Sequence, residues 1–67
     1  MIKKLRQKRG YTQEEMAELL QISLRQYVRI DNEYTIPRAD IFKKLIKVLK
    51  MNNEETGAFV VAVLKKR

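Results

Sequence analysis

The sequence predicts an all-α domain of five short helices. Apolar residues recur at helical spacing, and helix-capping residues precede several of these stretches. Only two glycines and one proline interrupt the 67 residues. A chain of this length forms one small domain with a thin core. It contains no cysteine and no histidine, which excludes a disulfide and a zinc site of the Cys/His kind.

The first two helices are recognisable by their ends. The first is expected over residues 2–9 and ends at Gly10, because glycine readily takes the left-handed conformation that terminates many helices. Thr12 and Glu15 form a capping-box pattern, in which each side chain bonds the backbone N–H of the other residue. The second helix is therefore expected to begin after Thr12 and to extend to Leu20.

Three further helices are expected in the second half of the chain. Ser23 is a suitable N-cap for a helix over residues 24–32. After a loop, residues 39–50 carry a wide apolar stripe flanked by lysines. Residues 53–65 are ambiguous, because the valine-rich run 58–64 has no polar face and suits a helix or a strand. The asparagine and glutamate residues at the start of this segment favour a helix.

The charge balance points to an acidic partner. There are 15 basic and 8 acidic residues, which gives a net charge of +7. Nucleic acid and an anionic membrane both fit this charge. No apolar run reaches the roughly 18 residues that a membrane-spanning helix needs, and the basic N-terminus is not followed by the apolar stretch of a secretory signal. We therefore expect a cytoplasmic protein, which the absence of disulfides also fits.

The expected helix over residues 24–32 has two different faces. At about 100° per residue, Arg25, Arg29 and Asn32 cluster on the outer side. An arginine can donate two hydrogen bonds to guanine in the major groove of DNA. Two arginines one turn apart therefore indicate a helix that reads bases. The inner side carries Ser23, Leu24, Tyr27, Ile30 and Asp31.

Several stretches of the sequence resemble one known family. Together they are similar to the XRE family of phage and bacterial regulators, named after Cro and the lambda-type repressors. The resemblance covers about residues 2–50. It implies a compact, lambda-repressor-like DNA-binding domain with a helix-turn-helix at its second and third helices. The stretches are Ile2–Arg6, Tyr11–Leu20, Ile22–Ser23, Arg29–Asn32 and Ile36–Pro37.

The resemblance also implies a role for individual positions. Arg6 and Asp31 match a pair that forms a partly buried ion pair between the first and third helices, and this pair orients the third helix. Leu24 would touch a thymine methyl group. The implied base contacts are Leu24, Arg25, Gln26 and Arg29, with a phosphate contact as the alternative for Gln26. The implied contacts to DNA phosphates are Gln13, Ser23, Asn32, Tyr34 and Arg38.

Among the departures from the family pattern, two concern the turn before the third helix and the ion pair. The family usually has glycine in the turn at the place of Gln21. A left-handed backbone at that position would cost a non-glycine residue about 1 kcal/mol. The family also usually carries glutamate at the place of Asp31, so the shorter side chain is expected to alter the geometry of its ion pair with Arg6.

The apolar run 58–64 predicts a protein contact. A helix that is apolar all round must be buried all round, and a domain of this size covers one side of its terminal helix. Residues 53–67 are therefore expected to contribute to a homodimer. A strand paired with the partner's strand would lead to the same contact, whereas the simpler alternative is that the segment only closes the core of one chain. The expected dimer residues are Phe59, Val60, Val63 and Leu64.

These observations predict one domain over residues 1–67 that binds double-stranded DNA as a homodimer and regulates transcription, most simply as a repressor. No enzyme chemistry, metal site, cofactor or small-molecule ligand is expected, because the glutamates are explained by helix capping and no nucleophile accompanies them. One alternative is an antitoxin-like or other protein-interaction module that uses Phe59–Leu64. Another is a membrane binder that uses the basic amphipathic helix 39–50.

Overall fold

The computed structural model describes residues 1–66, so Arg67, the last residue of the predicted domain and of its segment 53–67, lies outside the described residues. Over residues 1–66 the chain forms five helices and no strand, which confirms the all-α prediction. The run 58–64 is helical, which decides between the two alternatives. The helices are α1 (Ile2–Arg9), α2 (Gln13–Leu20), α3 (Leu24–Asp31), α4 (Ala39–Leu49) and α5 (Asn53–Lys65).

The helix ends follow local signals in the sequence. α1 ends at Gly10, whose φ of 81° lies in the left-handed region. Complete capping boxes begin α2 at Thr12, α3 at Ser23 and α5 at Asn52. In the first of them, the Thr12 hydroxyl accepts from the Glu15 amide at 3.1 Å. These caps satisfy backbone groups that a helix end leaves without partners.

The turn between α2 and α3 has a strained backbone at Gln21. Gln21 has a φ of 57° and a ψ of 44°, a left-handed conformation that costs a residue with a Cβ roughly 1–2 kcal/mol. Its side-chain oxygen accepts a hydrogen bond from the Lys44 ammonium at 2.9 Å. This bond ties the turn to α4, so the glutamine has a contact that the usual glycine could not make.

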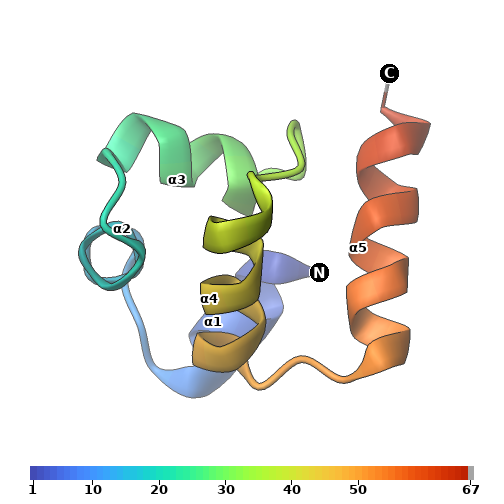
Figure 1. The fold of residues 1–67 in the computed structure, drawn as a ribbon. Coiled ribbons are helices and arrows are strands. Elements are labelled where there is room, and N and C mark those ends of the chain that lie inside the picture. Colours follow the sequence, from blue (N-terminus) through green and yellow to red (C-terminus); the bar gives the residue numbers. More distant parts are fainter. Residues whose placement is uncertain (67) are drawn as a thin grey trace.

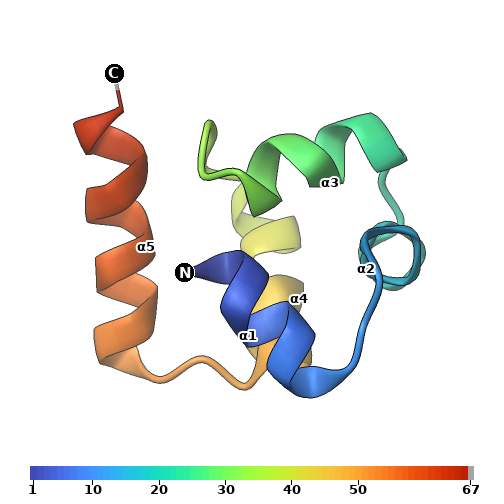
Figure 2. The same cartoon turned by 180° about the vertical axis from the view of Figure 1, so that it is seen from behind.

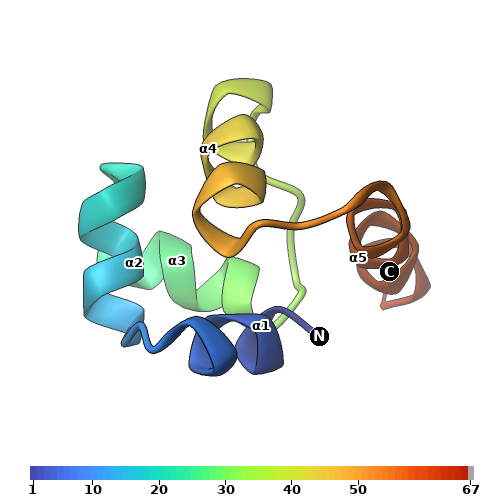
Figure 3. The ribbon, with the colours of Figure 1, turned by 90° about the horizontal axis from the view of Figure 1, so that it is seen from below.

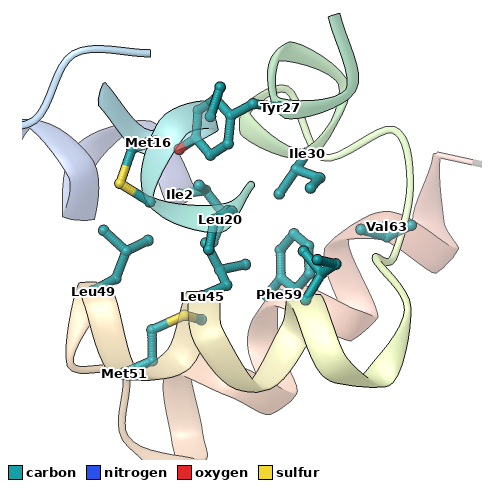
Figure 4. Close-up of a cluster of buried hydrophobic side chains, with 12 residues drawn as sticks. Ile2, Met16, Leu20, Tyr27, Ile30, Leu45, Leu49, Met51, Phe59 and Val63 are labelled. Carbon is teal, nitrogen blue, oxygen red and sulfur yellow. The ribbon is translucent and has the colours of Figure 1, made fainter. Parts of the chain in front are cut away.

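The helices enclose one core between α2 and α5. Figures 1 to 3 place α2 and α5 on opposite sides of the molecule with α1 and α4 between them, while α3 crosses one end. Figure 4 shows how side chains from all of these helices converge. The buried apolar residues are Ile2, Met16, Ala17, Leu20, Tyr27, Ile30, Ile41, Leu45, Leu49, Met51, Phe59 and Val63.

α5 is attached to this core by residues one turn apart. Phe59 and Val63 are fully buried, and the Phe59 ring meets Phe42 of α4 edge-on at 5.6 Å between centroids. Both were predicted to contact a second chain, but the core of the same chain already covers them, so that part of the prediction is corrected. The other two predicted dimer residues remain accessible: Val60 is half-buried and Leu64 is exposed.

Candidate nucleic-acid interface

α2 and α3 meet across the three-residue turn 21–23. Figure 1 looks along α2 while α3 lies across the view, so the two helices cross steeply. Ala17, in the middle of α2, is buried, and its small side chain allows a close approach. Tyr27 and Ile30 are buried and form the inner face of α3. One side of α3 therefore packs against the core, and the other side is exposed to solvent.

Asp31 is the centre of a buried hydrogen-bond network beneath α3. Its Oδ1 accepts from Arg6 Nε at 3.0 Å, and its Oδ2 accepts from Arg6 Nη2 at 3.2 Å. The Tyr27 hydroxyl donates to Oδ1 at 2.9 Å, and Gln13 Nε2 donates to Oδ2 at 3.1 Å. Arg6 Nη1 also donates to the Tyr11 carbonyl at 2.9 Å. The network thus joins α1, the start of α2 and α3.

The predicted ion pair between Arg6 and Asp31 forms with both carboxylate oxygens engaged, despite the shorter aspartate. Tyr27 and Gln13 also join this ion pair, which was not predicted from the sequence. Tyr27 lies four residues before Asp31, a spacing at which helical side chains meet, so its part could have been found from the sequence. The bond from Gln13 to Asp31 spans 18 residues, and no local pattern indicates it.

The network also determines the protonation states of its members. Burial alone raises the pKa of Asp31, but the hydrogen bonds from Arg6, Gln13 and Tyr27 outweigh it, so the pKa lies below its usual value. Burial and the neighbouring carboxylate raise the pKa of Tyr27. At neutral pH the carboxylate is therefore charged and the phenol protonated, which are the states that these hydrogen bonds require.

The outer face of α3 carries the predicted base-reading residues. Arg25 and Arg29 are exposed, and Leu24 is 45% exposed although the helical count placed it inward. Gln26 is exposed as well, but its side-chain oxygen accepts from the Ser23 amide at 3.0 Å. Gln26 and Ser23 thus form the capping box of α3. The Ser-x-x-Gln spacing signals this role, which the sequence analysis had not assigned to Gln26.

A groove joins this face to the start of α4. Gln26 and Arg29 line it from α3, and Arg38 lines it from the N-cap of α4. Its volume is about 390 Å³. The groove therefore brings together two predicted base contacts and one predicted phosphate contact. Its remaining lining residues are Ile22, Ile30, Thr35, Ile36, Pro37 and Ile41.

The predicted phosphate contacts lie at helix ends and in the loop after α3. Gln13 is the first residue of α2 and is half-buried against Asp31. Ser23 is the N-cap and Asn32 the C-cap of α3. Tyr34 is 59% exposed in the following loop. Arg38 is exposed and lies 3.6 Å from the carboxylate of Asp40.

Comparison with known families decides the class of this protein. A family model described as helix-turn-helix, HTH_3, matches residues 2–52, about three quarters of the chain. The chain belongs to this helix-turn-helix family. Membership confirms the resemblance to Cro and C1-type (XRE) regulators and the lambda-repressor-like fold. No curated protein and no solved structure matches the chain.

Family membership gives the helix-turn-helix protein its general function. It implies DNA binding in transcriptional regulation, and the family is non-enzymatic. Within residues 1–66, no helix combines the length and the apolar character that crossing a membrane requires. α5 lies beyond the residues that the family model matches.

Proposed function

We propose that this helix-turn-helix protein is a sequence-specific transcriptional repressor that binds a pseudo-palindromic operator as a homodimer in the cytoplasm. The observation that carries the proposal is the pair Arg25 and Arg29, exposed one turn apart on a helix whose inner face is fixed by packing and by the Asp31 network. Each subunit would place α3 in the major groove, with half-sites about 34 Å apart. Occupation of the promoter would block transcription.

The contacts divide into base readout and phosphate contact. Leu24, Arg25 and Arg29 project from α3 and would read bases, with Gln26 at the edge of the groove. The phosphate contacts would come from helix ends, where free backbone N–H groups favour anions. At Gln13 the carboxylate of Asp31 orients the side-chain nitrogen, whose second hydrogen is available to a phosphate.

Arg25→Ala and Arg29→Ala are expected to remove sequence preference. Each loses about 1–3 kcal/mol of discrimination at each half-site of the preferred duplex, because an arginine no longer bonds its base. The preferred duplex is first selected from random sequences, and binding of each variant is then measured on it and on random duplex. Gln13→Ala should instead weaken binding to both duplexes similarly.

Lys47→Ala, on the exposed side of α4, is the matched control for loss of a positive charge. It should leave the preference unchanged. Equal losses on both duplexes for the two arginine variants would contradict their assignment to base readout. A wild-type binding constant that does not fall with salt would contradict DNA binding itself, since each neutralised phosphate contributes a log–log slope of about −0.9.

The proposed dimer surface is the outer side of α5. Val61 and Leu64 are 49% and 54% exposed on this side, where Ala58 is also exposed. Together with the half-buried Val60, they form an apolar stripe opposite the buried Phe59. The homodimer proposal therefore keeps Val60 and Leu64 from the sequence analysis and adds Val61.

Val61→Glu is expected to shift the protein toward monomer, because a charge replaces apolar surface at the centre of the stripe. Sedimentation equilibrium measures the shift, and binding to the full operator should fall more than binding to a single half-site. Gln7→Glu makes the same charge change on the exposed surface of α1 and should have neither effect. A wild-type monomer that co-purifies with an unrelated chain would instead favour the protein-interaction alternative.

A further inference from the structure

The C-terminal end of α5 lies close to the C-terminal end of α3. Figures 1 and 2 show the end of α5 and the loop after α3 at the same end of the molecule. There Lys66 Nζ donates a hydrogen bond to the Asn32 carbonyl at 2.5 Å. The same ammonium lies 5.0 Å from the centre of the Tyr34 ring. A residue outside the family match thus contacts two of the predicted phosphate-binding positions.

We propose that Lys66 belongs to the DNA-binding surface, where it offsets the negative end of α3 and holds a backbone phosphate. The inference rests on the proposed function, and it extends the interface to α5. Neither the family match nor the sequence analysis assigns this residue a role.

The electrostatics of the α3 end are the first argument. Asn32 is the C-cap of α3, and the last carbonyls of a helix carry a partial negative charge of about half a unit. That charge would repel a phosphate approaching Asn32 or Tyr34. The ammonium of Lys66 donates to the Asn32 carbonyl, so its full positive charge exceeds the partial negative charge of the helix end. Glu33 of the same loop accepts from the amino group of Met1 at 3.1 Å, which offsets its charge.

The donor groups of Lys66 are the second argument. An ammonium has three N–H donors. Within residues 1–66, one of them bonds the Asn32 carbonyl. No other acceptor for this ammonium lies within the described residues, so its remaining donors would be available to a phosphate. Contact with the Tyr34 ring holds a long, flexible side chain in place. Less conformational entropy is then lost when DNA binds, so this lysine is better prepared for a phosphate than a fully mobile one.

The test compares Lys66→Gln with Lys65→Gln. Both substitutions remove one charge from an exposed side chain at the end of α5. Binding to the selected duplex is measured between 50 and 200 mM salt, and thermal unfolding checks that both variants fold. Lys66→Gln should reduce the log–log salt slope by about 0.9 for each subunit, or about 1.8 for the proposed homodimer. Between 50 and 200 mM salt, the affinity of the wild-type dimer would then fall by a factor about 12 times larger than that of the variant. Lys66→Arg should keep the wild-type slope.

The outcomes separate this proposal from the proposed function. Lys65→Gln should change the slope by less than half as much, because its charge contributes only to the general field. Equal changes in the two glutamine variants, or no change in Lys66→Gln, would overturn the role of Lys66 while DNA binding by the wild type stands. A wild type that binds no DNA would overturn the proposed function and this inference with it.

Discussion

Asp31→Ala is expected to destabilise the protein by about 3–5 kcal/mol, because it leaves the guanidinium of Arg6 buried without a counter-charge. The Arg6 side chain is only 10% exposed. The Tyr27 hydroxyl and the Gln13 amide also lose their acceptor. Small domains are stable by as little as about 5 kcal/mol, so the variant should unfold at much lower urea concentration.

A double-mutant cycle with Arg6→Ala tests the cause. The double variant should be less destabilised than the sum of the two single variants, since neither charge is then left buried alone. Tyr27→Phe removes one hydrogen bond and should cost about 0.5–1.5 kcal/mol. Additive effects of Arg6→Ala and Asp31→Ala would mean that the ion pair does not operate as a unit.

The same residue predicts a dependence of stability on pH. The folded-state pKa of Asp31 is lowered, so its contribution is present above the ordinary value of 3.8 and is lost as the pH falls through the folded-state value. Urea unfolding of the wild type should therefore show a loss of stability in acid. Asp31→Ala should show a smaller loss over the same range.

Phe59→Ala is expected to cost about 3–5 kcal/mol in the free energy of unfolding, the usual range for a buried phenylalanine. The substitution removes the edge-on contact with Phe42 and leaves α5 with Val63 as its remaining fully buried residue. Denaturant unfolding at one fixed chain concentration measures the effect. Because α5 then loses its main attachment to the core, its helical content should fall as well.

Leu64→Ala is the control on the opposite side of α5. Leu64 is 54% exposed, and its truncation should change the stability of the single chain by no more than about 0.5 kcal/mol. If Phe59→Ala cost no more than Leu64→Ala, the attachment of α5 to the core would be contradicted. If Leu64→Ala lowered only a concentration-dependent part of the stability, it would support the proposed dimer surface.

The helices and the outer face of α3 could be predicted from the sequence because their causes are local. Gly10 ends α1 through its backbone conformation, and Thr12 and Glu15 begin α2 with reciprocal hydrogen bonds three residues apart. The exposure of Arg25 and Arg29 follows from the period of one helix. Each of these properties depends on neighbours within one or two turns, so a sequence pattern records it.

The docking of α5 and the polar network depend instead on residues distant in the sequence. An apolar run without a polar face does not indicate which side packs inward, so the burial of Phe59 and Val63 becomes evident only in the folded core, where the Phe59 ring meets Phe42 of α4. The bond from Gln13 to Asp31 spans 18 residues and that from Lys66 to Asn32 spans 34. Such contacts form because packing brings separate helices together, and no local spacing in the chain encodes them.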